Sequence, residues 1–212
     1  GFSESGHGGR RVQDEIALLL KGAGIRAIGP NCLSPINTAN NLVIGFDPHE
    51  KLHRGSASFV LQSGFYEPRL EWIFWDLNLG VNKLIDLGNK IDINEVDSLE
   101  YLARDQATGV IAIHLESIAG DSKRFFELLK ETAKQKPTVV LKSGRTEAGA
   151  AAVSSHTGAI VKGSPEVFDS ALAQAGAVRA YNIEEFFEYA KAFEFLAPLR
   201  LAGNRIAIAC LS

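Results

Sequence analysis

A single histidine stands in a run of small residues in "LKSGRTEAGAAAVSSHTGAI", residues 141–160. The neutral imidazole of His156 could act as a nucleophile near pH 7, because histidine titrates close to that pH. The surrounding glycines and alanines would let the backbone approach a ligand closely. The segment is also longer than the usual strand-to-helix connection, which favours a functional loop. The competing interpretation is that His156 is only a polar spacer at the surface.

Other polar residues directly follow apolar runs. Gln62, Ser63 and Gly64 come after "SASFVL", and Glu116 comes after "VIAIHL". If a helix begins at Ser63, its free N–H groups and partial positive charge would suit an anion. A simple helix cap is the competing role for this serine. Glu116 could orient an imidazole or hold a cation, or it could be a solvated charge after a strand.

Two further groups of residues are assigned ordinary roles. The segment "GNKIDINEVD", residues 88–97, offers Asp92, Asn94 and Asp97 as oxygen ligands. It lacks the glycine and the final glutamate of a calcium loop, so it predicts helix capping and no metal site. The remaining histidines are interpreted as surface residues: His7, His49, His53 and His114.

The elements that must position these residues alternate regularly from residue 56 to residue 196. Apolar strand patterns occupy 56–62, 81–88, 109–116, 137–142 and 177–181, and helical patterns occupy 69–80, 94–105, 121–135, 164–176 and 182–196. This alternation is typical of a parallel sheet with helices on both faces. Five such units predict a doubly wound, flavodoxin-like α/β sheet. Ligands of such sheets bind beyond the carboxyl ends of the strands, where the polar residues described above would gather.

The two ends of the chain read as parts of other units. A helix is expected at 11–22, with Val12, Ile16 and Leu19 on one face and a left-handed glycine at position 22 or 24 at its end. A short strand at 25–29 would close an earlier parallel sheet, and 37–54 would be a linker. We therefore divide the chain into 1–53, the end of one domain with its linker, 54–198, the sheet domain, and 199–212, the start of a further α/β domain.

Composition limits the possible partners. The chain has 212 residues, of which 46% are hydrophobic and 22% charged, and its net charge is −3. This balance indicates a soluble globular protein without a general attraction to nucleic acid or membrane lipid. Only two cysteines are present, Cys32 and Cys210, and their separation suits a reducing cytoplasm. Small molecules and other proteins are the expected partners.

Several motifs together resemble one protein family, the ADP-forming (NDP-forming) acyl-CoA synthetases, which are related to the alpha subunit of succinyl-CoA synthetase. The motifs are "GPNCL" at 29–33, "QSG" at 62–64, "LGNKIDINEVDSLEYL" at 87–102, "HLES" at 114–117 and "LKSGRTEAGAAAVSSHTGA" at 141–159. They occur in order and in register over nearly the whole chain. The resemblance implies a flavodoxin-like ligase domain preceded by the C-terminal part of a CoA-binding Rossmann domain.

The resemblance also implies a reaction. In that family, phosphate cleaves an acyl-CoA to an acyl phosphate, and the phosphoryl group passes to a histidine and then to ADP. His156 would be the carrier and Glu116 the residue that orients its ring. The residues implied in phosphate binding are Gln62, Ser63, Gly64, Thr157 and Gly158, and those implied near the CoA thiol are Asn31 and Cys32.

The implied ligands extend beyond this sequence. CoA or acyl-CoA, phosphate, and ADP or ATP with Mg are expected, and the nucleotide would bind an ATP-grasp domain or subunit. For turnover, this sequence would therefore need either further domains in the same polypeptide or a second subunit. An oligomer is also expected.

One departure and two alternatives stay open. The family usually has serine two positions before Ser63, where this chain has Leu61. The first alternative is an acyl-CoA-responsive regulatory module without turnover, such as part of an acetyltransferase fusion, and the second is a simple interaction domain. The presence of His156 and Glu116 favours the ligase, Leu61 slightly favours the regulatory module, and the ordered motifs disfavour the interaction domain.

Overall fold

The computed structural model describes residues 2–33, 35–45, 52–63, 74–144 and 164–197, together with residues 203 and 207. Six of the residues singled out from the sequence lie outside this set: His49, Gly64, His156, Thr157, Gly158 and Cys210. So do the first five residues of the helix expected at 69–80 and nearly all of 199–212, the expected start of a further domain. None of the helices in the described part of the chain is long and apolar enough to cross a membrane.

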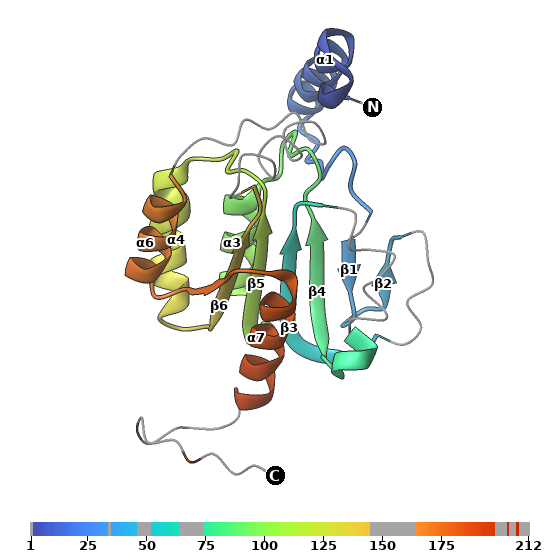
Figure 1. The fold of residues 1–212 in the computed structure, drawn as a ribbon. Helices are drawn as coiled ribbons and strands as arrows, with labels where there is room; N and C mark the ends of the chain where they lie inside the picture. The colour runs from blue at the N-terminus through green and yellow to red at the C-terminus, as the bar shows by residue number, and fades with distance from the viewer. Residues whose placement is uncertain are drawn as a thin grey trace.

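Five parallel strands form the centre of the molecule (Figure 1). They are β3 (Arg54–Leu61), β4 (Val81–Asp86), β5 (Val110–Leu115), β6 (Thr138–Lys142) and β7 (Val178–Ala180). Their spatial order is β4-β3-β5-β6-β7, so the first strand of the five lies between the second and the third. This is the flavodoxin-like order of a doubly wound sheet. The fold class predicted from the sequence is therefore confirmed.

Helices cover both faces of the sheet. On one face lie α3 (Glu95–Arg104), α4 (Ser122–Ala133) and α6 (Pro165–Ala175), and on the other lie α7 (Ile183–Leu196) and the helical residues 74–77. Successive strand residues point to opposite faces, so Phe59 and Leu61 join one core and Val60 joins the other. Such double burial favours runs of apolar residues, which are present in the second half of β3 and in most of β5 and β6.

The helix starts follow from their capping residues. Asn94, Asp121, Ser164 and Asn182 each accept a backbone N–H in the first turn of the helix that follows. At α3 the Asp97 carboxylate also accepts the backbone N–H of Asn94, which completes a capping box. The capping role predicted for this segment is thus confirmed.

The edge of the sheet beside β4 differs from the prediction. Two short strands, β1 (Pro35–Asn37) and β2 (Leu42–Val43), extend the described sheet to seven strands, and both pair antiparallel. We expected residues 1 to about 36 to end a separate sheet and 37–54 to be a linker. For the strands at 35–37 and 42–43 this expectation is wrong, because both pair within this sheet. The physical reason is burial, because Ile36 lies opposite Leu84 of β4 and is almost fully enclosed.

The N-terminal helix stands apart from the sheet. After a short 3-10 helix, η1 (Ser3–Ser5), helix α1 (His7–Ala23) ends at Gly24 in the left-handed conformation, as predicted. Figure 1 shows α1 beyond the carboxyl ends of the parallel strands, clear of the two helical layers. The apolar face predicted for this helix is therefore uncovered, with Val12 and Leu19 exposed by 45% and 72%.

The strand expected at 25–29 does not form. Gly29 and Asn31 have positive φ values of 94° and 60°, which interrupt an extended strand. The segment instead runs along the loop after β4, where the backbone N–H groups of Ile91 and Ile93 donate to the carbonyl oxygens of Gly29 and Ala27 at 2.9 and 3.1 Å. The "GPNCL" motif is thereby placed beside the carboxyl edge of the sheet.

Candidate functional site: a polar cluster at the carboxyl edge

The register of the strands brings the predicted polar residues to one edge. Leu61 of β3 lies opposite Asp86 of β4, and Leu115 of β5 lies opposite Lys142 of β6. The residues that follow these strand ends therefore leave the sheet together. Among them are Gln62 and Glu116, both buried.

Gln62 joins the end of β3 to the segment after β5. Its Oε1 accepts the backbone N–H groups of Glu116 and Ser117 at 2.8 and 3.0 Å and the Lys90 ammonium at 3.0 Å. All three partners are donors, which identifies this atom as the carbonyl oxygen of the amide. Its Nε2 donates to Ser117 Oγ at 3.1 Å. The oxygen of Gln62 is therefore fully engaged within the protein.

Lys90 and Glu95 form a buried ion pair beneath Gln62. The Lys90 Nζ lies 2.8 Å from Glu95 Oε2, and the two side chains are 2% and 0% exposed. The Lys90 ammonium also donates to the carbonyl oxygen of Ser117 at 2.6 Å. Burial lowers the pKa of Lys90, while the negative charges of Glu95 and Glu116 act in the opposite direction. Sequence reasoning missed both residues as members of the site.

Glu116 is held through its backbone and lies near two ammonium groups. Its carbonyl oxygen accepts the Lys142 Nζ at 2.8 Å, and the same Nζ donates to the carbonyl oxygen of Ser143 at 2.7 Å. Burial lowers the pKa of Lys142 to about 8, Arg179 and Lys90 add to that effect, and Glu116 opposes it. The Glu116 carboxylate thus influences the pKa of both Lys90 and Lys142.

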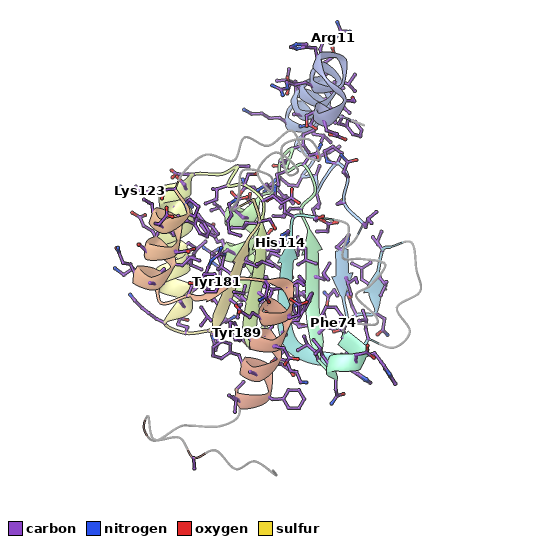
Figure 2. All side chains as sticks on the ribbon, viewed as in Figure 1. Arg11, Phe74, His114, Lys123, Tyr181 and Tyr189 are labelled. Carbon is purple, nitrogen blue, oxygen red and sulfur yellow. The ribbon has the colours of Figure 1, made fainter. Side chains whose placement is uncertain are left out.

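His114 is a further member of this edge, and its assignment to the surface is wrong. It is 1% exposed, and its Nε2 lies 2.7 Å from Ser143 Oγ. Burial lowers the pKa of His114 to about 3, and the nearby charges of Lys142 and Lys90 contribute. Figure 2 places it on β5 within the sheet. We call Gln62, Lys90, Glu95, His114, Glu116 and Lys142 the carboxyl-edge cluster.

The buried His114 should make the protein sensitive to acid. Its pKa is about 3 in the folded state, against the ordinary histidine pKa of 6.5 in the unfolded chain. Between these pH values the unfolded chain binds more protons, so stability falls as pH falls. From pH 7 to pH 5 this contribution should cost ~2 kcal/mol of unfolding free energy. In His114→Gln the loss over that range should be smaller by this amount. Urea unfolding of both proteins at the two pH values checks it, and identical losses would contradict it.

Leu61 does not face this edge. Its side chain is buried in the apolar core beneath α7, together with Phe59 and Leu141. Leucine, which stands here in place of the family's usual serine, therefore makes contacts within the apolar core. The presence of Leu61 is therefore only weak support for the alternative of a regulatory module without turnover.

The remaining predicted residues lie around the cluster. Ser63 follows Gln62, but the helix expected after it lies outside the described residues, so its role as anion site or helix cap stays a prediction. The Asn31 Nδ2 donates to Glu4 Oε1 at 2.8 Å and to Asn89 Oδ1 at 3.2 Å. Burial, followed by the charge of Asp86, raises the pKa of the Cys32 thiol.

The "GPNCL" segment is joined directly to the end of β4. The backbone N–H of Leu33 donates to Asp86 Oδ2 at 2.8 Å, and the backbone N–H of Asn89 donates to the carbonyl oxygen of Pro30 at 2.8 Å. Asp86 Oδ1 also accepts the backbone N–H of Gly88 at 3.2 Å. Asn31 and Cys32 are therefore held near the loop that carries Lys90.

The chemistry of the cluster suits a site that orients a reacting side chain. In the part of the chain that the structure describes, no group of three or more His, Cys, Asp or Glu side chains could hold a metal ion. A cavity of about 400 Å³ lies elsewhere, between the β1–β4 edge and α3, and no cluster residue lines it. The cluster instead combines two buried carboxylates, two ammonium groups and a neutral imidazole at the point where the chain leaves β5 and β6. Such groups can orient a ring and offset developing charge.

Comparison with known proteins shows similarity to CoA ligases. The family model described as succinyl-CoA ligase like flavodoxin domain matches residues 54–193. Acetate–CoA ligase (ADP-forming) I of Archaeoglobus fulgidus is 39% identical over 96% of this chain and 29% of its own length. The alpha subunit of acetate–CoA ligase (ADP-forming) II of Pyrococcus furiosus is 36% identical over 98% of this chain and 44% of its own length.

The fold is also similar to that of a solved acetyl-coenzyme A synthetase structure. The dinucleotide forming acetyl-coenzyme A synthetase 1 of Ca. Korarchaeum cryptofilum, in complex with phosphate and ADP, has a TM-score of 0.84 and 34% identity. The match covers 92% of this chain and 41% of that chain. This chain therefore spans less than half the length of these relatives.

Proposed function

Because the chain belongs to the succinyl-CoA ligase like flavodoxin domain family, we propose that it is the acid–thiol ligase core of an ADP-forming acyl-CoA synthetase. One observation carries the proposal. Buried Glu116 follows β5 at the position where the neighbouring strand β6 ends, and the chain segment that bears His156 begins directly after β6. A carboxylate and the start of the segment that carries His156 are thus side by side.

The proposed reaction has three steps. A phosphate oxygen attacks the carbonyl carbon of the acyl-CoA, and the C–S bond breaks to give an acyl phosphate and CoA. An imidazole nitrogen of His156 then attacks phosphorus, and the carboxylic acid leaves as its carboxylate. Finally an oxygen of ADP attacks the same phosphorus, which forms ATP and restores His156. The reverse sequence forms acyl-CoA from the acid, CoA and ATP.

Glu116 would act on the histidine ring. An imidazole that attacks phosphorus with one nitrogen carries a proton on the other, and a carboxylate that accepts this N–H fixes the tautomer and stabilises the developing positive charge. The phosphate contacts proposed beside it are Ser63, Gly64, Thr157 and Gly158. The resemblance implies a phosphate contact for Gln62 as well, but its hydrogen bonds to the backbone of Glu116 and Ser117 favour a different role. Asn31 and Cys32 are proposed to lie near the reacting thioester, a role that their position beside the carboxyl edge supports.

The ligands and partners are proposed on the same basis. The relatives' names point to short carboxylic acids such as acetate, and to CoA and ADP as the other reactants. One relative is an alpha subunit, which supports a separate nucleotide-binding partner for this chain. We assign the nucleotide and Mg to an ATP-grasp domain or subunit, and we assign the complete enzyme to the cytoplasm as an oligomer.

A labelling experiment tests the proposal. The complete enzyme, given acetyl-CoA with radioactive phosphate, should gain a phosphoryl group on His156, because the acyl phosphate formed in the first step transfers it there. ATP labelled at its γ-phosphate, with magnesium, should give the same product in the reverse direction. Peptide mapping under alkaline conditions locates the label, since phosphohistidine survives alkali and is lost in acid. Absence of label with both donors, or label on another residue, would contradict the proposal.

A further inference from the structure

The loop after β4 holds Lys90 in an uncommon backbone conformation. Lys90 has a φ of 58°, in the left-handed region that residues other than glycine rarely adopt. Its side chain is directed inward, and its ammonium reaches Gln62 Oε1, Glu95 Oε2 and the carbonyl oxygen of Ser117 at 3.0, 2.8 and 2.6 Å. An ammonium has three N–H groups, so these three acceptors satisfy it. Unusual backbone conformations persist where surrounding contacts determine them, and this loop is such a case.

The contacts of this group converge on one short segment. Gln62 Oε1 accepts the N–H groups of Glu116 and Ser117, and Lys90 donates to the Ser117 carbonyl oxygen. Glu95 Oε1 accepts the N–H groups of Ala119 and Gly120 at 2.9 and 2.8 Å. The backbone of residues 116–120 is therefore held by five hydrogen bonds from three buried side chains.

Residues 116–120 pack on the start of α3, which is fixed by its capping residues. Glu95 is in the first turn of α3, whose capping box at Asn94 fixes the start of the helix. Gly120 packs directly on that start, because a Cβ added to Gly120 would lie 2.9 Å from Asn94 Oδ1 and 2.9 Å from Val96 Cγ2. A carboxylate near a helix N-terminus is also favoured by the helix dipole. The segment that carries Glu116 thus rests on the start of α3.

From these contacts we propose that Gln62, Lys90 and Glu95 are positioning residues, which fix the backbone of residues 116–120 and so set the direction of the Glu116 carboxylate. The inference rests on the proposed function of Glu116. It assigns the three side chains to orientation of the catalytic carboxylate and not to contact with substrate. In Gln62 the carbonyl oxygen carries this role, since it is the atom that binds the backbone of Glu116.

Two variants of Gln62 separate this role from phosphate binding. Gln62→Met removes the oxygen at nearly constant volume, whereas Gln62→Glu keeps an acceptor for both N–H groups and for Lys90. Misplacement of a catalytic group by about 1 Å costs on the order of 100-fold in rate. Phosphorylation of His156 in the complete Gln62→Met enzyme should therefore slow by about 10- to 100-fold. The KM for acetyl-CoA should stay unchanged, because the role is not substrate binding, and Gln62→Glu should recover most of the rate.

The opposite order of the two variants would overturn the inference. If Gln62 contacted phosphate through its amide N–H groups, the added negative charge in Gln62→Glu would repel the anion, and this variant would be slower than Gln62→Met. Equal rates for Gln62→Met and the wild type would also overturn it. A wild-type enzyme without any label on His156 would instead overturn the proposed function, and the inference with it.

A double variant tests the role of the Lys90–Glu95 ion pair. Lys90→Met combined with Glu95→Gln replaces both charges, so neither is left buried without its partner. Labelling of His156 should again slow by about 10- to 100-fold, with an unchanged KM for acetyl-CoA and a folded protein by circular dichroism. This variant also serves if Gln62→Met does not fold. Wild-type labelling rates in the folded double variant would overturn the inference.

Discussion

Replacing His156 with alanine should abolish phosphorylation of the complete enzyme and, with it, the formation of ATP from acetyl-CoA, phosphate and ADP. The expected loss is complete because the proposed reaction passes every phosphoryl group through this imidazole, and alanine has no atom that can accept it. The two described cores consist of side chains that the substitution leaves unchanged. The thermal midpoint should therefore stay close to that of the wild type.

A matched histidine provides the control. His7 is exposed at the start of α1, so His7→Ala removes an imidazole away from the carboxyl-edge cluster. This variant should be labelled to the wild-type level from either donor. Undiminished labelling of His156→Ala would show that the acceptor is another residue, and His156 would then be the polar spacer considered from the sequence.

The sheet could be predicted because its signal is local. Most of the parallel strands contain a short apolar run, and helices α3, α4, α6 and α7 each begin at a residue such as Asn94 or Ser164 that caps it. The edge strands could not be predicted in this way. Residues 35–37 have no alternating pattern, and they become a strand only because Ile36 is buried opposite Leu84, far away in the sequence.

Of the site residues, the sequence could predict only those whose position is determined by the end of a strand. Glu116 directly follows β5, so topology alone places it at the carboxyl edge. Lys90 and Glu95 are different, because their roles depend on a left-handed backbone at Lys90 and on a side chain that turns inward, neither of which a sequence pattern shows. His114 was misjudged because β5 is buried on both faces, so a polar residue within it has no exposed face to occupy.

Neutralising Glu116 should separate its catalytic role from its structural one. Glu116→Gln should slow phosphorylation of His156 by about 10- to 10,000-fold, the scale on which loss of an orienting carboxylate acts, because the amide cannot offset the charge that develops on the imidazole. The backbone N–H of Glu116 donates to Gln62 and its carbonyl oxygen accepts from Lys142, and the substitution keeps both hydrogen bonds. The fold should therefore survive.

Single-turnover labelling with an alkaline quench measures this effect, with Glu127→Gln as the matched control. Glu127 is exposed on α4, where it lies 3.9 Å from Lys123, so its neutralisation should leave the labelling rate unchanged. A second consequence follows from the site's electrostatics. Glu116 raises the pKa of Lys142, which is about 8, and without that negative charge the pKa should fall further. A Glu116→Gln enzyme that labels as fast as Glu127→Gln would show that this carboxylate does not orient the phosphoryl carrier.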